Sequence, residues 1–244
     1  MIYHFRRNTN PVLFNSIIDF HNHLIPGIDD GSPSINYSLR MLQIFEKLGL
    51  EGCIPSPHIH SDLYPNSVQT IYQSYQSLKN EASYSNFIRG YGAEYMLTPY
   101  FFYHLDKKVD LLPVFKNYLL VETPFHILPK YFNLLVIQLN EMGFQPILAH
   151  PERYLYIKTI NDLINIKEMG CYLQLNATSL ASKYGGRINK RAREILHKDL
   201  YDFVGTDAHS IGDLKLLGKL KLSGTDLKGW ELICEKHVDH MNED

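Results

Sequence analysis

The sequence predicts an α/β protein built as a TIM-like barrel of seven parallel strands, a (β/α)7 barrel. Short runs rich in branched and aromatic residues alternate with helical patterns, as in the right-handed crossovers of a parallel sheet. Seven such units favour a closed or nearly closed barrel over an open sheet. No glycine-rich dinucleotide-binding loop follows the first strand, as it would in an open doubly wound fold.

The seven predicted strands are short and bounded by turn-forming residues. In chain order they are SIIDFH (16–21), EGCIPS (51–56), FIRGYGAE (87–94), YLLVET (118–123), QPILAH (145–150), CYLQLNA (171–177) and DFVGTDAH (202–209).

Helical periodicity fills the segments between these strands. The first helix is predicted to begin at Ser32-Pro33, an N-cap residue followed by proline at the first helical position, and to run to residue 48. The other predicted helices span 68–83, 127–142, 159–169 and 189–198, and a terminal helix over 225–240 packs on the outside. His237 and His240, near the end of that helix, are expected to be solvated.

Composition fits one globular domain outside the secretory route. The 244 residues are 45% hydrophobic and 20% charged, and a net charge of -2 gives no basic field for nucleic acid. Cys53, Cys171 and Cys234 are too far apart for a thiolate zinc site or a disulfide framework. Without a signal peptide or a long apolar run, a cytoplasmic location is predicted. We expect an N-terminal extension over 1–18 and a single domain over 19–244.

Ionisable side chains stand at the carboxyl end of nearly every predicted strand. They are His21 and His23 with Asp29 and Asp30 in the next loop, His58 with His60 as a weaker candidate, Glu94, Glu122, His150, Asp207 and His209. In a parallel barrel these strand ends converge on one face, where such enzymes keep their active sites. Unpaired charges in a cleft are costly, and divalent cations would satisfy all of them. The pattern therefore predicts a metal site.

Seven segments of the chain resemble the polymerase-and-histidinol-phosphatase (PHP) superfamily, and within it the bacterial capsule and exopolysaccharide tyrosine-protein phosphatases. The segments, in the family order from residue 19 to about 210, are DFHNHLIPGIDDGS, SPHIH, YGAEY, LLVETP, ILAHPERY, CYLQLNATSL and FVGTDAHS. The resemblance implies a distorted seven-stranded PHP barrel with two or three divalent metal ions, manganese being favoured over iron or zinc.

The resemblance also implies roles for individual residues. The metal ligands would be His21, His23, Asp30, His58, Glu94, Glu122, His150, Asp207 and His209, with Asp29 left open as the alternative to Asp30. Arg153 would bind the substrate phosphate, and Arg153, Asp30 and His209 would be the catalytic residues. Relatives can carry an arginine after the DAH motif; here Lys215 is the nearest base and the second expected substrate contact.

The activity implied is hydrolysis of phosphotyrosine by a metal-bridging hydroxide, in the regulation of capsule or exopolysaccharide synthesis. This chemistry is that of a phosphoric monoester hydrolase, and no Cys-x5-Arg loop of a thiolate phosphatase occurs. The partner implied is the phosphotyrosine tail of a bacterial tyrosine kinase of the polysaccharide co-polymerase type, without nucleic acid or membrane span.

Three other functions stay open. Another PHP-type phosphoesterase, such as histidinol phosphatase or a phosphodiesterase, would use the same metal ligands. An amidohydrolase commonly has lysine at the end of strand four, where this chain has Glu122. A metal-binding barrel without activity is the third.

Two segments beside the predicted site each have two interpretations. The aromatic segment TPYFFYHLDKK (98–108) forms either a wall against a phenolic ring or buried packing or a subunit contact. The basic residues after the sixth strand form either an exposed helix start or a docking surface for acidic or phosphorylated tails. They are Lys183, Arg187, Lys190, Arg191 and Arg193.

Overall fold

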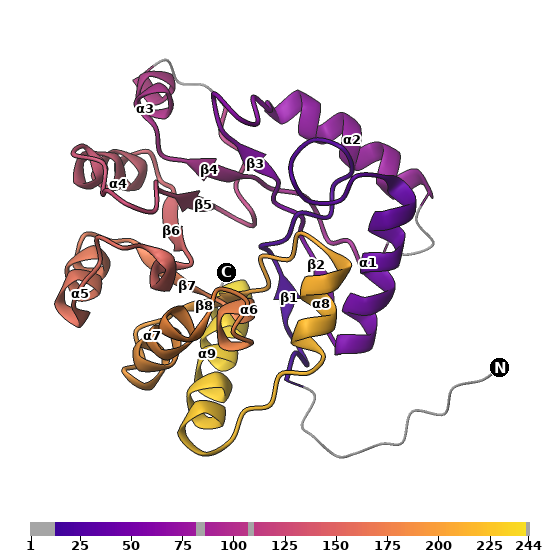
Figure 1. The fold of residues 1–244 in the computed structure, drawn as a ribbon. Coiled ribbons are helices and arrows are strands. Elements are labelled where there is room, and N and C mark those ends of the chain that lie inside the picture. The colour runs from indigo at the N-terminus through magenta and orange to yellow at the C-terminus, as the bar shows by residue number, and fades with distance from the viewer. Residues whose placement is uncertain (1–12, 82–85, 107–109, 243–244) are drawn as a thin grey trace.

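The computed structural model describes residues 13–81, 86–106 and 110–242, and helices surround its strands (Figure 1). The strands are β1 (Ile18–Asp19), β2 (Gly52–Cys53), β3 (His58–Ile59), β4 (Glu94–Met96), β5 (Tyr118–Glu122), β6 (Gln145–Ala149), β7 (Tyr172–Asn176) and β8 (Phe203–Gly205). The helices are α1 (Ile35–Leu48), α2 (Val68–Glu81), α3 (Pro99–Asp106), α4 (Phe132–Glu141), α5 (Ile160–Glu168), α6 (Ala177–Leu180), α7 (Gly186–His197), α8 (Ile211–Leu217) and α9 (Gly224–Asn242), with a 3-10 turn at Pro151–Arg153.

The strands form two parallel sheets. One sheet holds β3 to β8 in sequential order, and the other pairs β1 with β2. The predicted α/β class with parallel strands is therefore confirmed, whereas these pairings leave the closed seven-stranded barrel a prediction. The second predicted strand ends early because Pro55 and Pro57, between β2 and β3, have no N–H to donate to a ladder.

Several helix boundaries differ from the predicted ones for local reasons. Helix α1 is capped by Ser34, whose hydroxyl accepts from the Tyr37 N–H at 3.3 Å, and not by Ser32. Helix α4 begins at Phe132 rather than residue 127, since Pro129 disfavours helix at the residue before it. Helices α3, α6 and α8 are short and were not predicted.

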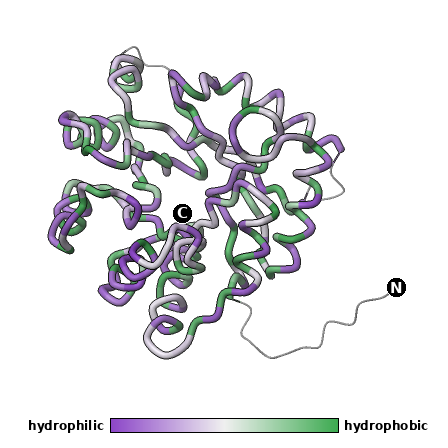
Figure 2. Tube along the Cα trace, in the orientation of Figure 1, coloured by the Kyte–Doolittle hydropathy of each residue, from purple (hydrophilic) through white to green (hydrophobic). Residues whose placement is uncertain are grey.

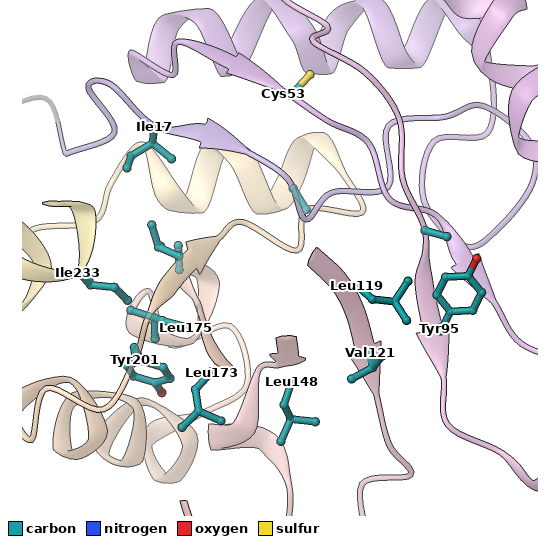
Figure 3. Packing of buried hydrophobic residues seen from close by; sticks show 14 of the residues in the cluster. Ile17, Cys53, Tyr95, Leu119, Val121, Leu148, Leu173, Leu175, Tyr201 and Ile233 are labelled. Atoms are coloured by element: carbon teal, nitrogen blue, oxygen red, sulfur yellow. The ribbon is translucent and has the colours of Figure 1, made fainter. Parts of the chain in front are cut away.

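Hydrophobic side chains form two clusters on opposite faces of the strands. In β5, Leu119 and Val121 belong to the larger cluster between strands and helices, and Leu120 belongs to the smaller one. This division follows from the alternation of side chains along a strand. Figure 3 shows Leu148 and Leu173, from β6 and β7, among the larger cluster. The helices alternate between hydrophobic and hydrophilic residues along their length (Figure 2), as amphipathic helices on a sheet do.

Helix α9 packs against the strands by one face. Trp230, Ile233 and His237 follow each other at helical spacing and are all buried. The Trp230 indole N–H donates to the Leu13 carbonyl at 2.6 Å, and Phe14 packs on its ring. The expectation that His237 is solvated was therefore wrong, because the helical period places it inward.

His237 predicts a pH dependence of stability. Its Nδ1 accepts from the Val204 N–H, so its Nε2 donates to the Ile18 carbonyl. Burial lowers its pKa from 6.5 to about 4. As pH falls, the unfolded chain therefore binds a proton at His237 before the folded chain does. The contribution of neutral His237 to the free energy of unfolding is complete above pH 6.5 and is lost as pH falls toward 4. We expect His237→Gln to remove about 2 kcal/mol of the stability loss between pH 7.5 and 5, measured by urea unfolding. The exposed His126→Gln is the control, and an unaltered slope in His237→Gln would contradict the prediction.

No helix of the described residues is both long enough and apolar enough to cross a bilayer.

Candidate metal centre

The nine predicted ligands converge at the carboxyl ends of the strands. Seven of them come from the carboxyl end of a strand or the loop after it, whereas His58 and Glu94 are the first residues of the short strands β3 and β4. Segments far apart in sequence thus meet in one place. Most of the nine are buried; His58, His209 and Asp30 are the exceptions, and the Asp30 side chain is the most exposed at 52%. The opening of the centre therefore lies on the side of Asp30.

Glu94 stands in the middle of the imidazoles. Its Oε2 lies 3.2 Å from His21 Nε2, 3.5 Å from His23 Nε2 and 3.2 Å from His58 Nδ1, and its Oε1 lies 3.2 Å from His150 Nε2. Burial alone would raise the pKa of Glu94, but the charges of His21 and His58 hold that pKa well below 4.5. Both carboxylate oxygens therefore face ring nitrogens.

Asp207 divides its two oxygens between the centre and its surroundings. Its Oδ1 lies 3.4 Å from a ring nitrogen of each of three imidazoles, those of His21, His23 and His209. Its Oδ2 accepts from Arg153 Nη1 at 2.9 Å, from Asn176 Nδ2 at 2.6 Å and from the Tyr184 hydroxyl at 3.2 Å. These bonds fix the orientation of the carboxylate toward the imidazoles.

Glu122 extends the centre along β5. Its Oε1 lies 3.1 Å from His58 Nδ1, and its Oε2 lies 3.8 Å from His150 Nε2. Glu122 and Glu94 thus share two imidazoles, a geometry in which carboxylates can bridge ions.

The two adjacent aspartates do different things. Asp29 Oδ2 accepts from His23 Nδ1 at 2.8 Å and from the His58 N–H at 3.2 Å, and Asp29 Oδ1 accepts from the Gly31 N–H. Asp30 Oδ1 lies instead 3.6 Å from His58 Nε2 and 3.5 Å from His209 Nε2. Asp29 therefore orients an imidazole, and Asp30 faces the open side of the centre.

Hydrogen bonds from outside the centre fix which nitrogen of His21 and of His23 faces inward. Gln174 Oε1 lies 2.8 Å from His21 Nδ1, and an amide oxygen can only accept, so that nitrogen carries the proton. Asp29 does the same for His23. The Nε2 atoms of both rings then point at carboxylates, which is the arrangement that partners of metal-bound histidines impose. No sequence pattern marks Gln174 beyond its place within a predicted strand.

The residues present fit divalent cations. Among the described residues, three groups offer ligand atoms within 4.8 Å of one another: His23, Asp30, His58 and His209; His21, His23, Glu94 and Asp207; and His58, Glu94 and Glu122. Three buried atoms form no hydrogen bond with any described residue: His21 Nε2, His23 Nε2 and Glu94 Oε2. The two imidazole nitrogens nevertheless lie within 3.5 Å of the carboxylate oxygen. Without a cation, the neighbouring Glu94 and Asp207 overcome burial and raise the pKa of His21 to about 9. A cation would displace that proton.

Backbone geometry at the centre is unusual in two places. His150 and Asp207 have φ of 38° and 49°, the left-handed region that costs most non-glycine residues energy. Glycines allow close approach elsewhere: a Cβ on Gly205 would lie 2.7 Å from the His21 Cβ, and one on Gly31 would lie 2.3 Å from the His23 Cβ. The glycines in FVGTDAH and DDGS thus make room for the two imidazoles.

Arg153 lies beside the centre between two aromatic rings. Its guanidinium carbon is 4.5 Å from the Phe125 ring centroid and 4.2 Å from the Tyr184 ring centroid. Together with the ion pair to Asp207, these stacking contacts hold the guanidinium plane in place. Its side chain is 19% exposed, so a ligand can reach it. Sequence reasoning found the arginine but not its aromatic partners, which come from separate loops.

The other basic residues have varied positions. Lys215 is exposed on α8, and no contact within the described residues joins it to the centre, so its role stays a prediction. Lys183 lies 2.9 Å from Asp213, and Arg193 pairs with Asp226. Arg191 donates to backbone carbonyls, and Arg187 and Lys190 are exposed. Lys183, Arg191 and Arg193 therefore have structural contacts, and only the exposed Arg187 and Lys190 remain candidates for binding an acidic or phosphorylated tail.

The chain matches known proteins along most of its length. The model of a family described as "Capsular polysaccharide synthesis, CpsB/CapC" matches residues 17–215. The chain is 28% identical over 226 residues to CapC of Staphylococcus aureus, covering 91% of this chain and 88% of CapC. It is 27% identical over 205 residues to the tyrosine-protein phosphatase YwqE of Bacillus subtilis, covering 80% and 78%.

A solved structure has the same fold. It comes from work on YwqE of Bacillus subtilis and CpsB of Streptococcus pneumoniae, described as unique metal-dependent tyrosine phosphatases. The TM-score is 0.74 at 25% identity, and the likeness covers 91% of this chain and 95% of the solved one.

Proposed function

Because the chain belongs to the CpsB/CapC family of capsular polysaccharide synthesis, we propose that it is a metal-dependent protein-tyrosine phosphatase. It hydrolyses phosphotyrosine in proteins that control capsule or exopolysaccharide synthesis. The observation that carries this proposal is the cage of five imidazoles and four carboxylates beside a clamped arginine. Relatives along most of the chain are named tyrosine-protein phosphatases, which supports the same activity.

The cage is proposed to hold two or three ions, and the three overlapping ligand groups favour three. The proposed ligands are His21, His23, Asp30, His58, Glu94, Glu122, His150, Asp207 and His209. Asp30 is preferred to Asp29, whose oxygens already bind His23 and backbone N–H groups. Mixed imidazole and carboxylate ligands suit manganese, with iron or zinc as alternatives. Divalent ions, when bound, supply Lewis acidity and lower the pKa of coordinated water.

The protein's own groups bind the phosphate and assist the leaving group. Arg153 Nη1 donates to Asp207, and the other N–H donors of the guanidinium are those proposed to bind phosphoryl oxygens. In hydrolysis the oxygen of water bonds to phosphorus as the bond between phosphorus and the phenolic oxygen breaks, and the phenolic oxygen gains a proton that the water loses. His209 and Asp30 are among the most exposed cage members, so they lie where the leaving group departs. Lys215, on α8, is proposed as a more distant contact of the substrate.

The cysteines support a mechanism without a thiolate. Burial raises the pKa of Cys53 well above 9, and it raises the pKa values of Cys171 and Cys234 to about 12. A nucleophilic cysteine needs the opposite shift.

We also propose that the two sheets form one distorted seven-stranded PHP barrel, in which β2 and β3, separated only by residues 54–57, count as one interrupted strand. The chain after β1 bonds to the chain after β8, through the Asp207 N–H to the His21 carbonyl at 2.7 Å and the His23 N–H to the Ala208 carbonyl at 3.0 Å. Beside β2, the Cys53 N–H donates to the Phe87 carbonyl at 2.9 Å. The smaller apolar cluster, which joins residues of β5, β6 and β8 to Phe20, is what a barrel interior would contain.

The proposed substrate is the phosphotyrosine tail of a tyrosine kinase of the polysaccharide co-polymerase type. The protein is proposed to bind this tail in the cytoplasm. The family assignment supports it, and the exposed Arg187 and Lys190 suit an acidic or phosphorylated tail. A single domain over 19–244, preceded by an extension, is part of the same proposal.

Elemental analysis combined with turnover assays tests the function. Purified protein is expected to contain about two to three divalent ions per chain, following the three ligand groups. It is expected to hydrolyse a phosphotyrosine peptide with added manganese and to stop with a chelator. Histidinol phosphate is the competing substrate, and a preference for it would assign another phosphoesterase activity. Metal-loaded protein that hydrolyses neither would support a barrel without turnover.

A further inference from the structure

A cavity of about 270 Å³ opens on the rim beside the metal centre. It lies between the loop after β3 and the segment after β4 that includes α3, two elements that are neighbours in Figure 1. Its walls are mainly apolar, from Ile59, Pro65, Val68, Met96, Phe101 and Leu111. The proposed chemistry does not use this cavity.

The cavity and the cage are both built on the paired strands β3 and β4. His58 pairs with Glu94, and the next residues, Ile59 and Tyr95, pair with each other. The first pair belongs to the cage, and the second pair lines the cavity together with Met96. Consecutive Cα atoms are about 3.8 Å apart, so the backbone that lines the cavity begins one residue after that of the cage. Side chains alternate along a strand, so Ile59 and Tyr95 face away from the cage, and Met96 lies on the face of Glu94.

His60 gives the cavity a polar side chain whose Nδ1 is already occupied by hydrogen bonds. Its Nδ1 accepts from the N–H groups of Asp62 at 3.1 Å and Leu63 at 3.3 Å. A nitrogen that accepts carries no proton, so in the neutral ring the proton sits on Nε2 as a donor. Unlike its neighbour His58, His60 belongs to none of the three ligand groups found among the described residues. Asp110, also in the lining, disfavours an acidic occupant.

These features suit one side chain of a peptide bound across the rim. The volume is below the roughly 300–1,000 Å³ of sites for drug-sized ligands. An extended peptide advances about 3.3 Å per residue, so residues two or three positions from a phosphotyrosine reach the cavity. Resting on the proposed function, we propose that the cavity is a specificity subsite that receives a large apolar side chain of the substrate protein. Its apolar walls favour such a side chain over a small or charged one.

Peptides test the subsite in the wild-type protein. The series carries phenylalanine or alanine two or three residues to either side of phosphotyrosine and is compared with a chromogenic aryl phosphate. We expect kcat/KM for the best phenylalanine peptide to exceed that of its alanine counterpart about tenfold, the discrimination of one apolar pocket. Equal values for every pair would overturn the proposal.

Two substitutions in neighbouring positions of α2 locate the effect. Val68→Trp fills the cavity and is expected to bring the phenylalanine-to-alanine ratio to about one, through a higher KM. Gln69→Trp, exposed on the same helix outside the lining, is expected to keep the ratio. A ratio lost equally in both variants, or kept in both, would overturn the subsite. If Val68→Trp fails to fold, Leu111→Gln makes the same comparison from the opposite wall.

Other outcomes separate this proposal from the proposed function. Wild-type protein that turns over the aryl phosphate without peptide preference overturns only the subsite. Wild-type protein that turns over neither substrate with added manganese overturns both. A change of sedimentation coefficient in Val68→Trp, with the peptide ratio intact, would assign the cavity to a second copy of the chain and overturn the proposal.

Discussion

Glu94→Gln is expected to lower kcat/KM for an aryl phosphate by about a thousandfold or more and to reduce the metal content. The reason is the position of this carboxylate, which lies within 3.5 Å of four imidazoles in the centre of the cage. Glutamine keeps the shape but removes the charge and one acceptor oxygen. Steady-state kinetics and elemental analysis on the same preparation measure both effects.

The control for this variant is Glu141→Gln, at the exposed end of α4. It changes the net charge equally and should leave turnover and metal content as in the wild type. Full metal content in Glu94→Gln would remove Glu94 from the proposed ligands, even if activity fell.

Arg153→Ala is expected to lower kcat/KM by about a hundredfold to a thousandfold while the metal content stays near normal. The guanidinium is held between Phe125 and Tyr184 and by Asp207, so its donors are already oriented when substrate arrives. Arg153→Lys should recover little of the loss, because an ammonium neither stacks in that sandwich nor forms a fork with phosphate.

Arg187→Ala, exposed on α7, is the matched control for the loss of one arginine and should leave aryl phosphate turnover intact. Loss of metal in Arg153→Ala would show that the arginine supports Asp207 rather than the phosphate. Near wild-type kinetics in Arg153→Ala would exclude both roles.

The sequence could predict the position of the site because strand ends are readable from short apolar runs. His150 and Glu122 each follow such a run, and parallel strands bring their ends together. The choice between Asp29 and Asp30 could not be made, because it depends on which carboxylate the loop turns toward His23. The partners of Arg153 were equally hidden, since stacking between loops leaves no periodic pattern.

Errors in the fold prediction have a similar origin. Helices α3, α6 and α8 are short, and their ends are set by caps such as Ser210 with Asp213 rather than by long hydrophobic periods. His237 was misjudged because polarity was weighed above its place on the inner face of α9. Local signals therefore sufficed for most element types, and tertiary packing decided the exceptions.

The wide sequence span of the cage has a consequence for the life of the protein in the cell. Its members run from His21 to His209, so cations bound there would tie the first strand to the last and stabilise only the folded chain. Starvation for those cations would then shorten the lifetime of the protein against proteases as well as silence it. Its abundance would follow the supply of the nutrient that its activity requires.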